Sequence, residues 1–202
     1  MLFLLTYKFY EEYSNVMELL IVNNTSPFVI DIVNMIKDLN IPFQCKLYSE
    51  IKSEELSLYG AIILSGRRNY NRETNVKNNK IIEYCNNLDI PLLGICYGAE
   101  IINLFFGGSL IKLKNTIHGL VKVTSNTNNI FLPPDSSIYV YQSHRYAISR
   151  LSSDLELLCS SSQSKNEVFK HKKRNIFGVQ FHPEKSGIDG KSILYNFLRL
   201  AN

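Results

Sequence analysis

The stretch Pro91-Leu-Leu-Gly-Ile-Cys-Tyr-Gly-Ala-Glu100 decides how the rest of the chain is interpreted. An apolar run, Ile90 to Ile95, ends in a Gly-x-Cys-x-Gly frame, and a helical pattern of apolar residues follows at once. Glycines two residues to either side let the backbone turn sharply enough to push the Cys96 side chain clear of the strand. The pattern is typical of a strand, a tight turn and a helix, with a sulfur nucleophile at the bend.

The predicted position of Cys96 also favours its reactive form. The thiolate is the nucleophilic state of cysteine, and the positive end of a helix dipole stabilises it. The backbone N–H of Tyr97, the first residue of the predicted helix, would point to the place where an oxyanion forms. The alternative is a small apolar cysteine buried at a strand end. The two flanking glycines favour the nucleophile over this alternative.

A thiol nucleophile needs a base, and the base needs an orienting group, so the histidines come next. Of the four histidines, His182 lies in Gly178-Val-Gln-Phe-His-Pro-Glu184. A strand predicted over 176–181 runs directly into the proline, which ends it. Glu184 can then lie beside the imidazole and fix its tautomer. A surface or core histidine is the ordinary alternative, but a strand-end histidine with a carboxylate two residues later is a candidate base.

Gly94-Ile-Cys-Tyr-Gly98 and Gly178-Val-Gln-Phe-His-Pro-Glu184, in this order, resemble the two catalytic motifs of the class I glutamine amidotransferase family. The resemblance covers nearly the whole chain after Met17. It implies Cys96 as nucleophile, His182 as general base and acid, and Glu184 as the group that orients His182. The implied reaction is hydrolysis of glutamine to glutamate and ammonia through a cysteine thioester.

Weaker resemblances extend the candidate site. Ile63-Leu-Ser-Gly66 is similar to the family's oxyanion strand, which implies backbone N–H donors at Arg67 and Tyr97. Tyr141-Gln-Ser-His144 is similar to the segment that binds the backbone of glutamine. The substrate-binding residues implied in this way are Gly66, Glu100, Ser143, His144 and Arg145.

Two of these positions depart from the family pattern in ways that bear on chemistry. Glu100 stands where the family has a glutamine that touches the bound substrate, so it adds a charge there. Arg67 stands where a second glycine is usual, and a residue with a Cβ disfavours positive φ. We expect Arg67 and Arg68 to hold the loop in a nonproductive state until an acidic partner surface draws them outward. Alternatively, both side chains simply point to solvent.

The order of predicted elements indicates one α/β domain. Strands are predicted over 18–22, 43–48, 60–64 and 90–95, with helices over 27–39 and 76–88. Ser26 is the predicted cap of the first helix, with Pro27 at its first position. Further strands are predicted over 109–113, 120–124, 138–141, 167–169 and 176–181, and a closing helix over 187–198. We therefore expect a doubly wound, flavodoxin-like, mostly parallel sheet with helices on both faces and extra antiparallel strands.

Composition sets the class of protein. With 45% hydrophobic and 20% charged residues, the 202-residue chain is expected to be soluble and globular. We expect a domain over 17–202 and, over 1–16, a loosely held extension or a segment before the true start at Met17. Residues 1–16 lack a signal peptide's basic leader and are too short to cross a bilayer. Four scattered cysteines without a C-x-x-C pair fit a cytoplasmic protein without a metal site.

Charge and motifs narrow the expected partners. The net charge is only +4, and the local cluster Lys170-His-Lys-Lys-Arg174 is interpreted as a solvated hairpin tip. A nucleic-acid surface is the alternative, but no aromatic residues interleave with the charges. No P-loop and no Ser-Gly-Gly-x-Asp-Ser motif is present, so no cofactor is expected and ATP would be used by a partner. The expected partners are L-glutamine and an ammonia-accepting synthetase subunit, in a heterodimer or larger assembly, without nucleic acid or membrane.

Several functions within the family stay open. The Gly-Ile-Cys-Tyr-Gly variant most resembles the separate amidotransferase chain of archaeal two-subunit GMP synthase. Subunits of anthranilate, aminodeoxychorismate or imidazole glycerol phosphate synthase are alternatives, the last because of His-Pro-Glu-Lys-Ser186. A degenerate homologue that binds without turnover, or a hydrolase of γ-glutamyl peptides, is a further alternative.

Overall fold

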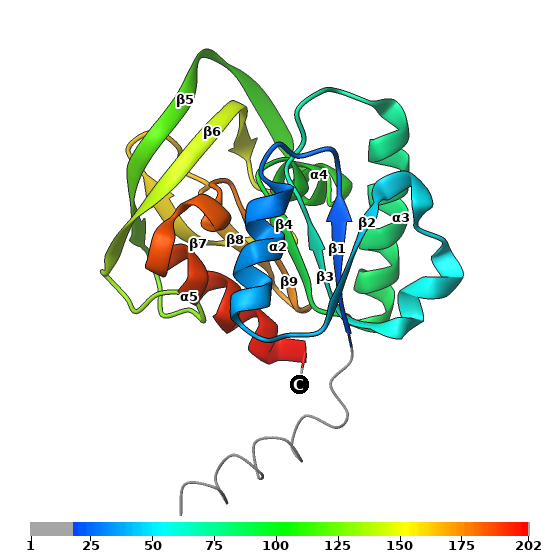
Figure 1. Ribbon diagram of the computed structural model, residues 1–202. Helices are drawn as coiled ribbons and strands as arrows, with labels where there is room; N and C mark the ends of the chain where they lie inside the picture. Colours follow the sequence, from blue (N-terminus) through cyan, green and yellow to red (C-terminus); the bar gives the residue numbers. More distant parts are fainter. Residues whose placement is uncertain (1–17, 202) are drawn as a thin grey trace, which may run out of the picture.

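A nine-stranded sheet runs through residues 18–201, the part of the chain that the computed structural model describes (Figure 1). The strand order is β2-β1-β3-β4-β9-β8-β7-β5-β6. The predicted N-terminal extension over 1–16 lies outside the described residues.

The first half of the sheet is parallel. Its strands are β1 (Glu18–Asn23), β2 (Phe43–Leu47), β3 (Tyr59–Leu64), β4 (Leu92–Ile95) and β9 (Ile176–Val179). All four neighbouring pairs in the order β2-β1-β3-β4-β9 are parallel, which is the flavodoxin-like arrangement. Strand β3 is buried along its whole length, as expected when helices cover both faces. The predicted fold class is confirmed.

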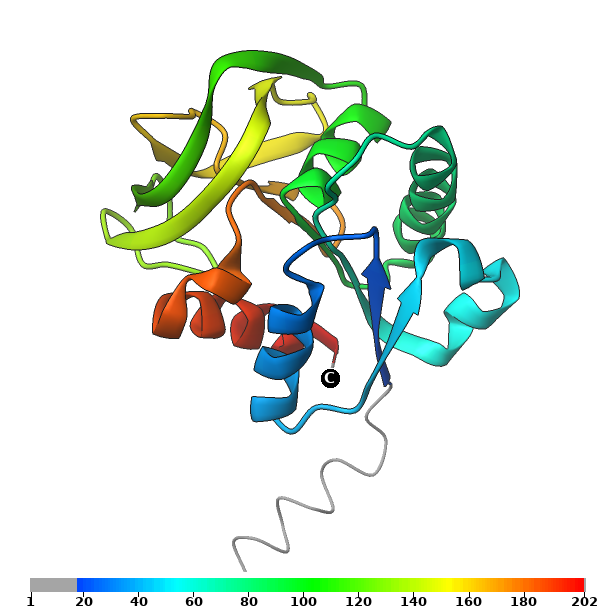
Figure 2. The same cartoon turned by 45° about the horizontal axis from the view of Figure 1, so that its top comes forward.

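Helices cover both faces of this parallel half (Figures 1 and 2). Helices α2 (Val29–Asp38) and α5 (Gly187–Leu198) pack on one face, in the same core as Leu19 and Ile21 of β1. Helices α3 (Arg72–Leu88) and α4 (Tyr97–Phe105) pack on the other, in the same core as Leu20 and Val22. The alternation follows from the two-residue period of a strand.

The second half of the sheet is antiparallel and differs from the prediction. Instead of three short strands, β5 (Ser109–Ser125) and β6 (Ser137–Arg150) form one long hairpin. The pairing register shifts between Lys112 and Ile117, and this shift accommodates Asn115 and Thr116. The strand therefore bends at these residues but does not end. Strand β7 (Leu155–Ser161), which pairs with both β5 and β8 (Val168–His171), was not predicted; its buried positions do not alternate cleanly.

Several element ends also differ. Helix α2 begins at Val29 rather than Pro27, because the Ser26 hydroxyl accepts a hydrogen bond from the N–H of Phe28 in a turn before the helix. Helix α3 begins at Arg72, four residues earlier than predicted, because the Asn71 side chain caps it. Short 3-10 helices η1 (Tyr48–Glu50) and η2 (Ser53–Leu58) replace the predicted link before β3. Helix α5 has the predicted bounds.

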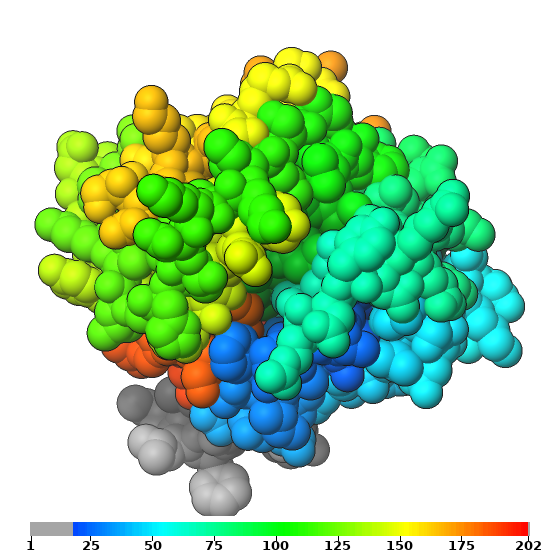
Figure 3. Space-filling view, turned by 90° about the horizontal axis from the view of Figure 1, so that it is seen from above, coloured from blue at the N-terminus to red at the C-terminus, as the bar shows by residue number. Residues whose placement is uncertain are grey.

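The carboxyl ends of the parallel strands define one end of the molecule. Seen from this end, the turn after β1, the loop after β3 and the β5–β6 hairpin meet around a narrow hollow (Figure 3). Open α/β sheets bind ligands at this edge. Among the described residues, no helix is long and apolar enough to cross a membrane.

Candidate active site

The turn between β4 and α4 is the predicted elbow. Cys96 has φ 52° and ψ −104°, a conformation that a residue with a side chain seldom adopts. A Cβ on Gly94 would lie 2.4 Å from the backbone of Gly98, and one on Gly98 would lie 2.3 Å from the carbonyl oxygen of Leu64. Both glycines are therefore required by close backbone packing, and the predicted sharp turn is confirmed.

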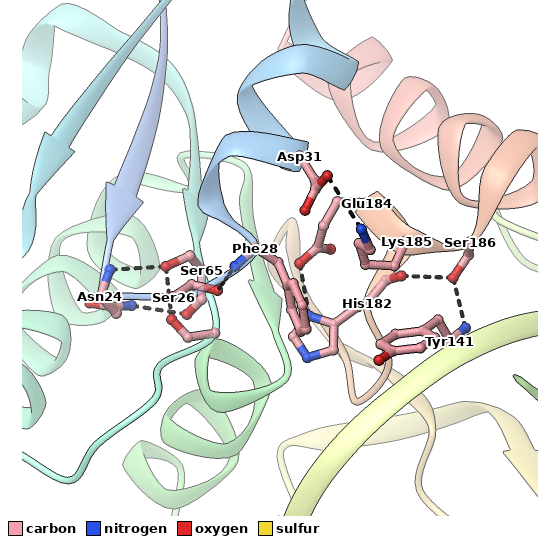
Figure 4. A network of polar contacts seen from close by, with 11 residues as sticks. Asn24, Ser26, Phe28, Asp31, Ser65, Tyr141, His182, Glu184, Lys185 and Ser186 are labelled. Carbon is pink, nitrogen blue, oxygen red and sulfur yellow. Dashed lines mark hydrogen bonds and ion pairs between the residues drawn. The ribbon is translucent and has the colours of Figure 1, made fainter. Parts of the chain in front are cut away.

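The base and its orienting group come from the chain after β9. In the 3-10 turn η3 (Pro183–Lys185), Glu184 accepts a hydrogen bond from Nδ1 of His182 at 2.8 Å, with both side chains buried (Figure 4). This contact leaves Nε2 of the imidazole available to Cys96, and the charge of His182 is close enough to lower the pKa of the Cys96 thiol. A Cβ on Gly66 would lie 3.1 Å from Cε1 of His182 and 3.7 Å from the Cβ of Cys96. Three segments far apart in the sequence thus converge on one point.

Residues outside the predicted set of site residues hold His182 in place. Its backbone N–H donates to the carbonyl of Tyr141 at 2.9 Å, and its carbonyl accepts from the hydroxyl of Ser186 at 2.7 Å. The ring of Phe28 packs edge-on against the imidazole, with 4.8 Å between centroids (Figure 4). Ser186 could have been found from the sequence, because it lies four residues after His182. Phe28 is far from His182 in the sequence, and only the fold brings the two together.

The electrostatics of the pair favour a shared proton. Burial raises the pKa of the Cys96 thiol, and the neighbouring His182 opposes that effect. Burial lowers the pKa of His182, but Cys96 and Glu184 together outweigh it and raise the pKa above its ordinary value. A lone thiolate would be costly at this buried position. Thiolate and imidazolium therefore form together, by proton transfer within the pair.

The loop after β3 is anchored by a buried polar network. The hydroxyl of Ser65 accepts from the backbone N–H of Asn24 at 2.9 Å and donates to the carbonyl of Gly66 at 2.9 Å (Figure 4). The Asn24 side chain donates to the carbonyl of Ser65 at 3.1 Å. Arg67 follows with a φ outside the left-handed region, so a Cβ is compatible with this loop. Asn24 was interpreted only as part of a turn.

The candidate substrate-binding residues divide into two groups. Gly66, Glu100 and His144 lie near the triad, since the charge of His182 shifts the pKa of both Glu100 and His144. Ser143 is only partly buried on β6, and the side chain of Arg145 is exposed and forms no hydrogen bond or ion pair with any residue in 18–201.

The two buried titratable groups near the triad have distinct states. Nδ1 of His144 donates to the carbonyl of Tyr146 at 2.6 Å, so Nε2 is an acceptor, and it has no partner among the described residues. Burial lowers the pKa of His144, which keeps the ring neutral. Burial raises the pKa of Glu100 to about 7, although Gln180 donates to Oε1 of Glu100 at 3.2 Å and Arg67 also opposes the shift.

The basic stretch Lys170 to Arg174 lies away from this site. Only its second part, Lys172 to Arg174, lies in the predicted tip between β8 and β9, because β8 continues through Lys170 and His171, and Lys170 pairs with Glu156 at 2.8 Å. A cavity of about 560 Å³ beside the tip is at the amino end of β9, and no triad residue lines it. Among the described residues, no group of three or more histidine, cysteine or acidic side chains has a metal-binding arrangement.

Comparison with known proteins agrees with this geometry. A model of the family described as Glutamine amidotransferase class-I matches residues 20–201. This chain belongs to the class I glutamine amidotransferase family.

Individual members of the family are similar to the chain over most of its length. The chain is 35% identical over 156 residues to the glutamine-hydrolyzing GMP synthase subunit of Thermoplasma acidophilum, covering 76% of this chain and 78% of the relative. It is 31% identical over 189 residues to a protein of Haemophilus influenzae named anthranilate synthase component II, covering 91% and 97%. A crystal structure of a GMP synthase subunit from T. acidophilum superposes with a TM-score of 0.82 at 30% identity, covering 93% and 94%.

Proposed function

We propose that this chain is a glutaminase subunit that hydrolyses L-glutamine to glutamate and ammonia and passes the ammonia to a synthetase, in chemistry of the GMP synthase type. The observation that carries the proposal is the buried His182–Glu184 contact of 2.8 Å beside an elbow cysteine. A nucleophile beside a base that a carboxylate orients is the arrangement that this kind of acyl transfer uses.

The proposed reaction proceeds in two halves. The Cys96 thiolate attacks the side-chain amide carbon of glutamine, and the backbone N–H groups of Arg67 and Tyr97 stabilise the oxyanion, at about 3 kcal/mol per donor. Protonated His182 gives its proton to the leaving ammonia, and a thioester remains. Neutral His182 then takes a proton from water, which attacks the thioester carbonyl. Collapse of that intermediate breaks the C–S bond, releases glutamate and returns the proton to the Cys96–His182 pair.

The remaining parts of the site support an amino acid substrate. Nε2 of His144, which has no partner in the described part of the chain, is an acceptor for an ammonium or amide N–H group. Glu100 adds a second acceptor at the position where the family has a glutamine. Gly66 leaves room beside Cys96, because even a methyl group there would crowd His182.

The synthetase is inferred from the relatives. The glutamine-hydrolyzing GMP synthase subunit of T. acidophilum, together with the similar crystal structure, favours a GMP synthase partner. The H. influenzae relative keeps anthranilate synthase as the second candidate. In either assembly the partner would consume the ammonia, and in the first it would also use ATP.

The proposal is tested by measuring glutamate release from glutamine by the purified chain, alone and with the synthetase chain of either enzyme and its acceptor. We expect turnover that rises with the synthetase chain of GMP synthase but does not rise with that of anthranilate synthase. The reverse pattern would assign the second candidate. Release of glutamate only from γ-glutamyl peptides, or no release under any condition, would reject the glutaminase proposal.

A further inference from the structure

The side chain of Arg67 is held by contacts with α3 and α4 and is only partly exposed to solvent. Its guanidinium carbon lies 3.8 Å from the centroid of the Tyr97 ring and 5.2 Å from that of Tyr70. Nη1 donates to Oδ1 of Asn75 at 2.7 Å and, less closely, to the carbonyl of Asn71 at 3.5 Å. A planar guanidinium can stack on a ring and donate in its own plane at once, which a lysine ammonium cannot do.

The contact closes a ring of three side chains. The hydroxyl of Tyr97 donates to the same Oδ1 of Asn75, at 2.8 Å. Tyr97 is only 4% exposed, and Arg67 is half-buried between it and Asn75. The ring joins the loop after β3, the first residue of α4 and the first turns of α3. We refer to Arg67, Asn75 and Tyr97 as the clamp.

The clamp joins the two residues that supply the proposed oxyanion donors. A donor stabilises the oxyanion only when it is held in place before the charge develops, so small displacements of the loop reduce turnover more than substrate binding. The neighbouring Arg68 carries the same charge but is exposed, and its side chain forms no hydrogen bond or ion pair within 18–201. The alternative that both arginines point to solvent is therefore wrong for Arg67, whose side chain is held, and right for Arg68, whose side chain is exposed.

We propose that Arg67 is a positioning residue, whose side chain clamps the loop after β3 (residues 65–71, the oxyanion loop) against Tyr97 and Asn75 and so fixes the Arg67 and Tyr97 N–H groups for catalysis. The inference rests on the proposed glutaminase function. It differs from the expectation that Arg67 holds the loop in a nonproductive state until a partner draws it outward, because it assigns the stacked, Asn75-bound position of the guanidinium to the productive loop.

Kinetics separate this role from a simple effect of charge. Arg67→Ala and Asn75→Ala should each lower kcat for glutamine roughly tenfold or more, a fraction of the loss of a whole donor, with KM changed by less than about twofold. Arg67→Lys keeps the positive charge near Glu100 but loses the planar guanidinium that stacks on Tyr97 and donates to Asn75, so its kcat should resemble that of Arg67→Ala. Arg68→Ala is the matched control and should match wild type. Wild-type kcat in Arg67→Lys would show that charge alone matters and would overturn the clamp.

A double-mutant cycle in urea unfolding gives a readout that does not depend on activity. Arg67→Ala and Asn75→Ala should be clearly non-additive in their unfolding midpoints, whereas Arg68→Ala and Asn75→Ala should be additive. Additive effects at 67 and 75 would overturn the clamp whether or not the chain is active. Coupling with unchanged kcat would overturn the positioning role. Coupling in a chain without any glutaminase activity would instead reject the proposed function and leave the clamp a structural contact.

Discussion

Replacing Glu100 by glutamine tests the electrostatics of the site through stability. The Glu100 side chain is buried on α4, and the residue is only 8% exposed. The groups that face it are Gln180 at the end of β9, Arg67 after β3 and the Cys96–His182 pair. Of these, Gln180 donates a hydrogen bond and Arg67 and His182 lower the pKa, but burial dominates and raises it to about 7.

The size and sign of the effect follow from this pKa. A rise from 4.5 to about 7 makes the ionised carboxylate about 3 kcal/mol less favourable in the folded than in the unfolded chain. The folded state holds the proton more tightly, so wild-type stability is fully present below about pH 4.5 and falls as pH rises through about 7. Glu100→Gln has no proton to lose. Its amide also gives a donor to Oε1 of Gln180, which has no hydrogen-bond partner within residues 18–201.

Urea unfolding of wild type and Glu100→Gln between pH 5 and 9 measures this difference. We expect the variant to gain stability relative to wild type as pH rises, approaching about 3 kcal/mol above pH 8. Glu83→Gln, an exposed site on α3, is the control and should show no such trend. Parallel pH profiles for wild type and Glu100→Gln would refute the reasoning, because they would mean that the Glu100 carboxylate ionises in the folded chain as easily as in water.

Two further predictions concern the triad and the elbow. His182→Ala should slow alkylation of Cys96 by iodoacetamide at pH 7, because burial raises the thiol pKa and the opposing imidazolium is lost; an unchanged rate would assign the thiolate to the helix dipole instead. Gly98→Ala should destabilise the fold by more than about 2 kcal/mol, since its methyl group would overlap the Leu64 carbonyl oxygen. Its urea midpoint should fall well below that of Ala99→Gly on the same helix turn, and equal midpoints would contradict the steric argument.

Local patterns predicted the parts of the fold that short segments determine. Gly94, Cys96 and Gly98 identify the elbow because each glycine is required by contacts with the turn itself or the adjacent strand. The bounds of α5 follow from its apolar period and the proline before it. The long β5–β6 hairpin could not be predicted in the same way, because its continuity through Asn115 depends on the partner strand.

Side-chain contacts between segments that are distant in the sequence could not be predicted from it. Asn24 and Asn78 exchange hydrogen bonds under the oxyanion loop, yet in the sequence both look like ordinary polar residues of a turn and a helix. Arg67 was interpreted as a departure from a glycine pattern, and only the fold shows that Asn75 and Tyr97 receive its side chain. Such contacts depend on how α3 and α4 pack, which no local pattern specifies.

The Cys96 sulfur is the proposed nucleophile of a glutaminase, and the whole mechanism depends on it. Glutamate release by wild type and Cys96→Ala, each with its synthetase partner, tests this role most directly, with circular dichroism to confirm that both are folded. We predict turnover in wild type and a loss of at least about a thousandfold in the folded variant, since the thioester forms on this sulfur. Turnover by folded Cys96→Ala within tenfold of wild type would contradict it.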